Sequence, residues 1–197
     1  MRGDFPGREI YLVRHGETQW NAVGRFQGRL DSPLTDRGKA QAAAYGRTLA
    51  PIASSLGMLA ASPLGRVRET TNILRLAGDF PAPRWEPLIT EVSLGSWDGL
   101  THDDIDAMWP DRLNDATASD WFLHAPDGEN YDDARARAAA WLDGVSGAVL
   151  AVSHGLIGRM IRGAYLGLSR EETVTLPVPQ DVIWHLAEGR ITPIPTH

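Results

Sequence analysis

The stretch YLVRHGETQWN (residues 11–21) begins with an apolar run typical of a buried strand and then places Arg14, His15 and Gly16 side by side where the run stops. The segment AVLAVSHG (148–155) repeats this pattern, because its apolar run also ends in a histidine followed by a glycine. A lone histidine is usually a packed or solvated residue, but two histidines at matched strand ends indicate a shared site. Glycine at such a position lets the backbone turn sharply and approach a ligand closely.

Around these two segments, short apolar runs alternate with segments of helical periodicity. Strands are expected at 9–16, 57–63 and 148–155, with a short one within 81–99 and a pair around the Glu188-Gly189 turn. Helices are expected at 34–51, 64–78, 101–110, 131–145 and 156–167. This alternation predicts an α/β fold with a mostly parallel sheet covered by helices on both faces. The sequence shows no repeat or linker, so residues 1–197 are expected to form a single domain.

Composition excludes several classes of function. The formal net charge of −6 leaves no global basic field that would draw the protein to nucleic acid or to an anionic membrane. The absence of cysteine excludes disulfides, thiolate metal sites and a cysteine nucleophile, and it fits a reducing compartment. Residues 1–9 lack the apolar core of a signal peptide, and no apolar run approaches the roughly 18 residues of a membrane helix. We therefore expect a soluble, cytoplasmic protein that binds neither nucleic acid nor membrane.

The neighbours of His15 indicate an anionic ligand. Ligands of open parallel sheets bind beyond the carboxyl ends of the strands, which is where His15 is expected. A guanidinium such as that of Arg14 offers a planar fork of donors matched to phosphate or carboxylate oxygens. The same positive charge disfavours an imidazolium, so His15 is expected to stay neutral and free to attack. The sequence has no H-x-E-x-H or similar cluster, so no metal site is expected. Four further histidines are expected to be packed or solvated: His102, His124, His185 and His197.

Residues 12–21, LVRHGETQWN, resemble the signature of the histidine phosphatase superfamily, branch 1, the phosphoglycerate mutase-like family. Four further segments resemble family motifs in the family's order: GRFQGRLDSPLTDRGKAQA (24–42), ASPLGRVRETT (61–71), ITEVSLGSWDGL (89–100) and AVSHG (151–155). The resemblance spans nearly the whole chain. It implies the phosphoglycerate mutase-like fold, a three-layer α/β/α sandwich.

The resemblance also implies a role for each of five residues. His15 would be the nucleophile that accepts the phosphoryl group as phosphohistidine. Arg14, Arg66 and a protonated His154 would surround the phosphoryl oxygens and stabilise the transition state. Glu91 would protonate the leaving oxygen and then activate the water that hydrolyses the phosphoenzyme. Neither a metal nor a cofactor is implied.

Supporting contacts follow from position within the motifs. The resemblance adds phosphate or substrate contacts at Thr18, Asn21, Gln27, Gly28 and the backbone of Gly155. Each of three has a local alternative, because Thr18 could cap a helix, Asn21 could close a turn and Gly28 could serve backbone geometry alone. Arg66 falls near an expected helix start, where unpaired backbone N–H groups favour the binding of an anion.

The choice between hydrolysis and mutase activity depends on basic residues after the acidic motif. Mutases of the family hold a phosphorylated carboxylate with additional basic residues in this region. No Lys or Arg occurs between Glu91 and Arg112. We therefore expect a metal-independent phosphomonoester hydrolase, a histidine acid-type phosphatase, acting on a small phosphorylated metabolite. The alternatives are a cofactor-dependent phosphoglycerate mutase and a non-catalytic module that binds a phosphorylated ligand.

Substrate selection is expected from the variable segment 98–131. Its mixture of Asp and Trp predicts a partly apolar rim that is not strongly basic, which favours a small monophosphate over a bisphosphate. Trp20, Trp97 and Trp109 either shape an apolar entrance or belong to the core, as large aromatics usually do. An edge strand near residues 182–194 could pair in a homodimer.

Overall fold

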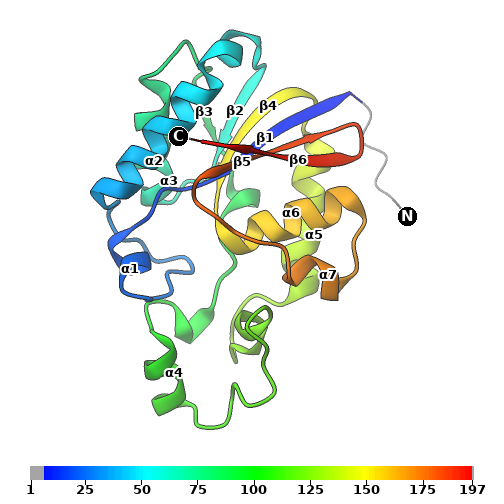
Figure 1. Ribbon diagram of the computed structural model, residues 1–197. Helices are drawn as coiled ribbons and strands as arrows, with labels where there is room; N and C mark the ends of the chain where they lie inside the picture. The colour runs from blue at the N-terminus through cyan, green and yellow to red at the C-terminus, as the bar shows by residue number, and fades with distance from the viewer. Residues whose placement is uncertain (1–6, 197) are drawn as a thin grey trace.

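The computed structural model describes residues 7–196 and contains one six-stranded sheet with helices on both faces (Figure 1). The strands are β1 (Arg8–Arg14), β2 (Met58–Ala61), β3 (Pro83–Trp85), β4 (Gly147–Ser153), β5 (Val182–Ala187) and β6 (Arg190–Pro195). The helices are α1 (Gln19–Ala22), α2 (Asp36–Leu49), α3 (Gly65–Arg75), α4 (His102–Met108), α5 (Tyr131–Gly144), α6 (Gly155–Leu166) and α7 (Arg170–Val174). The expectations for residues 1–6 and for His197 fall outside the described residues.

The strand order is β3-β2-β4-β1-β5-β6, in which the first four strands are parallel and the last two join antiparallel. This arrangement confirms the expected three-layer α/β/α fold with a mostly parallel sheet. The β5-β6 pair turns at Glu188 and Gly189, as predicted, and both residues have positive φ. No helical segment in residues 7–196 combines the length and apolar composition that a membrane crossing requires.

The central strands are apolar on both faces because helices cover both. Ile10 and Leu12 of β1 belong to the cluster that α5 and α6 cover, whereas Val13 belongs to the cluster that α2 and α3 cover. β4 alternates in the same way, with Val149 on the first face and Leu150 on the second. Successive side chains of a strand point to opposite faces, so an unbroken apolar run is what a doubly covered strand needs.

The ends of several elements differ from the sequence prediction. α2 was expected over 34–51, but it begins at Asp36 after the N-cap Thr35 and ends at Leu49, and Pro51 lies in a 3₁₀ helix that follows it. α3 ends at Arg75, before Gly78. The short helix α7 was not predicted, because a helix of about one turn is too short to reveal its periodicity in the sequence.

Gly16 is required by packing, and its expected close approach to a ligand stays a prediction. A Cβ atom at residue 16 would overlap the carbonyl oxygen of Gly38 in α2, and one at residue 38 would overlap the carbonyl oxygen of Glu17. The backbone N–H of Gly16 also donates to Thr70 Oγ1 of α3 at 3.1 Å. The turn after β1 is thereby pressed against both helices, which fixes the backbone beside His15.

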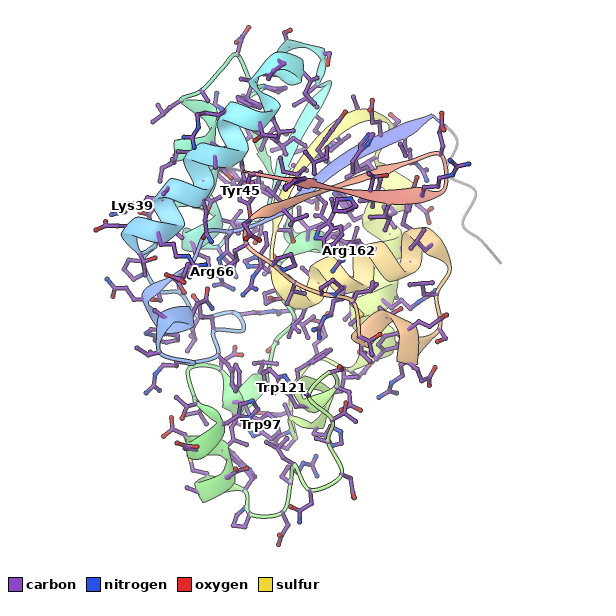
Figure 2. All side chains as sticks on the ribbon, in the orientation of Figure 1. Lys39, Tyr45, Arg66, Trp97, Trp121 and Arg162 are labelled. Atoms are coloured by element: carbon purple, nitrogen blue, oxygen red, sulfur yellow. The ribbon has the colours of Figure 1, made fainter. Side chains whose placement is uncertain are left out.

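A lobe of the chain lies between β3 and α5 and carries α4 (Figure 1). Figure 2 shows Trp97 and Trp121 inside this lobe. Trp97 is fully buried in the main core, together with Phe122 and Ile105. Of the two readings given to Trp97 above, the core reading is confirmed.

Candidate active site

The two strand-end histidines meet because β1 and β4 are neighbours in parallel register. Arg14 pairs with Ser153, so the residues that follow, His15 and His154, leave the sheet side by side. Their ring centroids are 5.3 Å apart at an interplanar angle of 65°. The backbone N–H of His15 donates to the carbonyl of Ser153 at 2.9 Å, which extends the sheet pairing to the nucleophile candidate itself.

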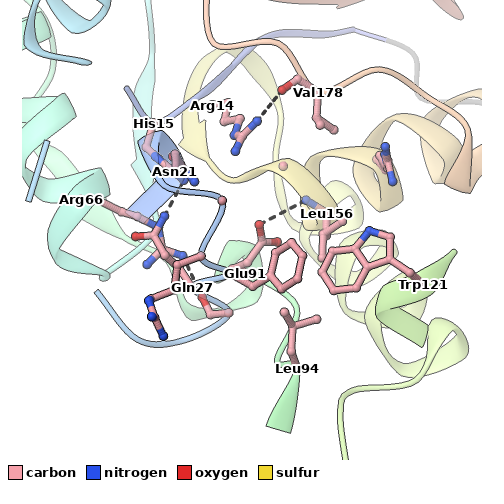
Figure 3. A pocket seen from close by; sticks show the side chains of 16 residues that line it. Arg14, His15, Asn21, Gln27, Arg66, Glu91, Leu94, Trp121, Leu156 and Val178 are labelled. Atoms are coloured by element: carbon pink, nitrogen blue, oxygen red, sulfur yellow. Dashed lines mark hydrogen bonds between the residues drawn. The ribbon is translucent and has the colours of Figure 1, made fainter. Parts of the chain in front are cut away.

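A pocket of about 270 Å³ opens at this edge of the sheet (Figure 3). Four of the five predicted catalytic residues line it: Arg14, His15, Arg66 and Glu91. His154 does not line it, and its ring makes a T-shaped contact with that of His15. The structure therefore gathers the five residues into one constellation, while their catalytic roles stay predictions.

The hydrogen bonds of His15 fix its tautomer. Nδ1 lies 2.8 Å from the carbonyl oxygen of Gly16, which can only accept, so Nδ1 carries the proton. Nε2 lies 3.2 Å from Nε of Arg66, which can only donate, so Nε2 presents its lone pair. Burial, with the charges of Arg66 and Arg14, holds the pKa of His15 well below its ordinary value. The imidazole is therefore neutral, as expected, whereas its Nε2 lone pair accepts from Arg66 and is not free.

Arg66 is a buried side chain and not a surface charge of α3. Its side chain is 1% exposed. Besides His15, it donates from Nη1 to the carbonyl of Leu30 at 2.6 Å and to Oδ1 of Asp31 at 2.9 Å, and from Nη2 to the carbonyl of Gly28 at 2.8 Å. These partners hold the guanidinium plane against the imidazole.

The start of α3 already has an anionic partner within the protein, the carboxylate of Asp31. The carboxylate of Asp31 accepts from the backbone N–H groups of Gly65 at 2.7 Å and Arg66 at 3.1 Å. This helix N-terminus is therefore already paired and does not hold the expected ligand. What faces the pocket is the Arg66 side chain.

Glu91 is held against the N-terminus of α6. Oε1 accepts from the backbone N–H groups of Val92 and Ile157, each at 2.9 Å, and Oε2 accepts from Leu156 at 3.2 Å. The residue is only 8% exposed, so it is not a solvated loop acid. Three fixed donors orient the carboxyl group and aim it into the pocket (Figure 3).

His154 is neutral in the protein without ligand, and its protonated form beside a bound phosphoryl group stays a prediction. Burial, followed by the charges of Arg66, His15 and Arg14, holds its pKa well below the ordinary value, so the ring is neutral. Nε2 lies 2.7 Å from Oγ of Ser62, and the buried Nδ1 has no hydrogen-bond partner within residues 7–196. The sequence showed the neighbouring arginines, but it did not show the burial of the His154 ring, which is the main cause of its lowered pKa.

These two buried neutral histidines should make stability depend on pH. Below about pH 6.5 the unfolded chain binds a proton at each histidine while the folded protein does not, so the free energy of unfolding should fall as pH falls. The slope is about 1.4 kcal/mol per pH unit per histidine. Urea unfolding between pH 5 and 7 measures it. A His154→Gln variant should lose about half of this slope, and an unchanged slope would contradict the assignment.

The supporting contacts divide into two groups. Asn21, Gln27, Gly28 and Gly155 line the pocket, whereas Thr18 does not. Thr18 caps α1, accepting from the backbone N–H of Asn21 at 3.1 Å, and its Oγ1 also accepts from Nε2 of Gln27 at 2.9 Å. The capping alternative is thus the one that the structure shows for Thr18, which acts on the pocket only through its neighbours.

The backbone conformation at residue 28 requires a glycine. Its φ is +49°, and a Cβ atom there would overlap the carboxylate of Asp98. Its carbonyl also holds Arg66. Gly155 lies against the guanidinium of Arg14, where a Cβ atom would come within 3.5 Å of Nε.

A segment near the C-terminus, residues 176–180, closes the site and was not predicted. Three successive carbonyls each accept from a different arginine: Leu176 from Arg159 at 2.7 Å, Pro177 from Arg162 at 2.5 Å and Val178 from Arg14 at 2.6 Å. Figure 3 shows the last of these bonds.

Gln180, at the end of the same segment, holds the loop after β1. Its Nε2 donates to the carbonyl of His15 and to Oδ1 of Asn21, each at 3.1 Å. Residues 176–180 therefore position both the predicted nucleophile, His15, and the pocket-lining amide of Asn21.

The pocket wall also departs from the expected rim. Trp121 lines the pocket, whereas Trp20, Trp97 and Trp109 do not. Arg25 and Arg159 line it as well, so the site is more basic than segment 98–131 alone predicted. Arg159 follows Gly155 by four residues and thus shares its helix face, a signal that the sequence did contain.

Metal binding remains a matter of prediction. Across residues 7–196, no group of three or more His, Asp and Glu side chains is placed to hold a metal ion. The expected metal-free chemistry therefore rests on the residue types at the site.

Comparison with known proteins agrees with the motifs and the geometry. The model of a family described as the histidine phosphatase superfamily (branch 1) matches residues 10–187. A relative from Photorhabdus laumondii, named as a probable phosphoglycerate mutase GpmB, is 33% identical over 170 residues, which covers 81% of this chain and 75% of that protein.

Solved structures share the whole fold. Bacillus stearothermophilus YhfR superposes with a TM-score of 0.79 at 30% identity, covering 95% of this chain and 96% of that one. A mycobacterial glucosyl-3-phosphoglycerate phosphatase in complex with VO3 has a TM-score of 0.78 at 28% identity, with 91% of each chain covered. The motifs, the fold and the family match together show that this chain belongs to branch 1 of the histidine phosphatase superfamily, whose members are phosphatases and mutases.

Proposed function

We propose that the protein hydrolyses phosphomonoesters of small metabolites without a metal, through a phosphohistidine formed on His15. The observation that carries the proposal is the state of His15 in the pocket. Its Nδ1–H is committed to the Gly16 carbonyl, and its Nε2 lone pair faces Arg66 beside the carboxyl group of Glu91. A fixed neutral imidazole among fixed cations suits attack on an anionic phosphorus centre.

In the first step, Nε2 of His15 attacks phosphorus and the ester P–O bond breaks. Protonated Glu91 gives its proton to the leaving oxygen, so the alcohol departs neutral. Arg66 and Arg14 stabilise the equatorial oxygens, for which Arg66 exchanges its bond to Nε2 for one to the phosphoryl group. A dianion bound in the pocket favours the protonated form of the neighbouring His154 ring, whose positive charge then stabilises the phosphoryl oxygens.

In the second step, the Glu91 carboxylate takes a proton from water as the water oxygen attacks phosphorus. The N–P bond breaks and its electron pair returns to Nε2 of His15. Inorganic phosphate leaves, and Glu91 is again protonated for the next cycle. The three backbone donors on Glu91 keep its carboxyl group in one place through both proton transfers.

Phosphoglycerate mutase activity is the alternative, and the name of the Photorhabdus laumondii relative favours it. A mutase must keep its phosphoenzyme away from water and return the phosphoryl group to a bound carboxylate substrate. The absence of Lys and Arg between Glu91 and Arg112 argues for hydrolysis instead. So does the likeness to a phosphatase structure at 28% identity.

The test is release of inorganic phosphate from a panel of phosphomonoesters in EDTA between pH 5 and 8. We expect release without added metal, and an acid-labile phosphoryl group on the peptide that contains His15 after rapid quenching. The His15→Ala protein, purified in parallel, reports any contaminating phosphatase. A folded protein that releases no phosphate but interconverts phosphoglycerates with 2,3-bisphosphoglycerate would establish the mutase. Ligand binding with neither activity would indicate a non-catalytic module.

A further inference from the structure

Arg137 of α5 and Glu129, which lies just before that helix, form a salt bridge outside the pocket. Nε of Arg137 donates to Oε1 of Glu129 at 2.9 Å, and Nη2 donates to Oε2 at 2.7 Å. The two side chains are only 15% and 11% exposed. Neither of them lines the pocket, so their effect on a substrate bound there must pass through other residues.

Nη1 of Arg137 holds the main chain immediately before Glu91. It donates to the carbonyl of Leu88 at 2.7 Å and to that of Thr90 at 2.6 Å. The guanidinium therefore uses four of its five N–H groups, two for the carboxylate and two for the main chain. A planar fork of donors fixes direction as well as distance, which a flexible ammonium group does not.

The main chain on the other side of Glu91 is held by Glu129. The backbone N–H of Ser93 donates to Oε2 of Glu129 at 3.4 Å, and the backbone N–H of Glu129 donates to the carbonyl of Ser93 at 2.9 Å. A further tie comes from β4, where Oγ of Ser153 donates to the carbonyl of Ile89 at 2.8 Å. The same ion pair thus fixes the chain before and after residue 91.

Glu91 depends on these ties because it lies between two 3₁₀ turns, Pro87–Ile89 and Gly95–Trp97, where neither a strand nor a helix sets its direction. Its carboxylate accepts from the backbone N–H of Leu156, as Figure 3 shows, and from that of Ile157. Both donors lie in the first turn of α6, where a helix offers its N–H groups no carbonyl of its own. The carboxylate reaches them only while the main chain at residue 91 keeps its position.

We propose that Arg137, with Glu129 as its partner, is a positioning residue that acts through Glu91. The pair fixes the main chain around residue 91, so the carboxyl group stays aimed at the place where the leaving oxygen is protonated. The effect on catalysis rests on the proposed function, whereas the positioning is a property of the folded protein without substrate. A misplacement of about 1 Å at a reacting group can lower a rate roughly 100-fold, which sets the size of the expected effect.

Hydrogen exchange tests the positioning without any substrate. In Arg137→Met, the backbone N–H groups of Leu156 and Ile157 should exchange roughly 10-fold faster than in the wild type, because their acceptor is no longer held in place. Glu91→Ala should have the same effect by removing the acceptor. The later turns of α6 should keep their wild-type rates. Equal acceleration along the whole of α6 would mean a general loosening and would overturn the proposal.

Arg8→Met is the matched control for the loss of bonds between an arginine and main-chain carbonyls. Arg8 donates to the carbonyls of Val145 at 2.7 Å and Asp143 at 3.3 Å, at the C-terminal end of α5. It begins β1, at the opposite end of that strand from His15. Arg8→Met should change neither the exchange of the two α6 groups nor phosphate release.

Kinetics separate action through Glu91 from general support of the fold. Arg137→Met should lower kcat for an alkyl phosphate roughly 10- to 100-fold and change KM by no more than about threefold. Added to Glu91→Gln, it should lower kcat by no more than about threefold further, because the residue through which it acts is already disabled. The full loss in that background would show that Arg137 does not act through Glu91.

Two further variants address charge and folding. Arg137→Lys keeps the charge without the fork, so it should recover only part of kcat, and complete recovery would overturn the positioning role. Arg137→Met leaves Glu129 with only the exposed Arg29, at 3.5 Å, so urea unfolding must show that the variant is folded. If it is not, Glu129→Gln/Arg137→Gln removes both charges together and takes the same measurements.

The exchange experiment distinguishes failure of this inference from failure of the proposed function. A protein without phosphatase activity, in which Arg137→Met still speeds exchange at Leu156 and Ile157 alone, would reject the hydrolysis and keep the positioning. Unchanged exchange at these two groups would reject the positioning, whether or not phosphate is released.

Discussion

Replacing His15 by alanine should lower kcat/KM for phosphate release by roughly 10⁴- to 10⁶-fold, the loss typical of removing a catalytic nucleophile. The variant keeps Arg14, Arg66 and Glu91 in the pocket, but no lone pair remains to accept the phosphoryl group. Substrate should still bind, because the cations remain. Steady-state kinetics, with rapid-quench labelling to look for the phosphoenzyme, measure both parts of the expectation.

His154 provides the matched comparison for this result. It is as deeply buried as His15, and its ring lies 5.3 Å away, so its replacement disturbs the same part of the core. His154→Ala should slow turnover yet still form a phosphoenzyme on His15. Phosphate release by His15→Ala within tenfold of wild type would show that another group is the nucleophile.

Replacing Glu91 by glutamine should lower kcat for alkyl phosphates by roughly 10²- to 10⁴-fold, the usual contribution of a general acid and base. The amide can neither protonate an alkoxide nor deprotonate water. The loss should be much smaller for formation of the phosphoenzyme from 4-nitrophenyl phosphate, because nitrophenolate leaves without a proton. Burst kinetics separate the two steps.

The glutamine also changes the local hydrogen bonding, so stability needs its own control. Both carboxylate oxygens accept from backbone N–H groups, and an amide nitrogen in one of these places would face another donor. Urea unfolding shows whether the variant remains folded under assay conditions. Equal losses on the alkyl and nitrophenyl esters in phosphoenzyme formation would contradict the general-acid role.

The sequence predicted the meeting of the two strand ends at the site. Two apolar runs that both end in His-Gly predicted neighbouring strand ends, and parallel register then brings His15 and His154 together. Arg66 was placed by its motif, whereas its burial was not, because burial depends on the carbonyls of Gly28 and Leu30, more than thirty residues away.

Contacts between distant parts of the chain could not be predicted in this way. Gln180 reaches His15 across 165 residues, and nothing in either local pattern indicates the other. The tryptophan that lines the pocket is Trp121 and not one of the three tryptophans considered, because an irregular lobe has no periodicity from which its side-chain directions follow. The neutral state of His154 similarly follows from enclosure by several elements.

The dependence of the site on residues 176–180 has a consequence for the order in which the protein matures during synthesis. When the nascent chain has emerged from the ribosome as far as the end of α6, it already contains His15, Arg66, Glu91 and His154. Arg14 still lacks its carbonyl partner on Val178, and the loop after β1 still lacks Gln180. The pocket is therefore completed last, when the segment leading into β5 docks. A nascent chain would thus hold all four of these predicted catalytic residues before the contacts that position them are complete.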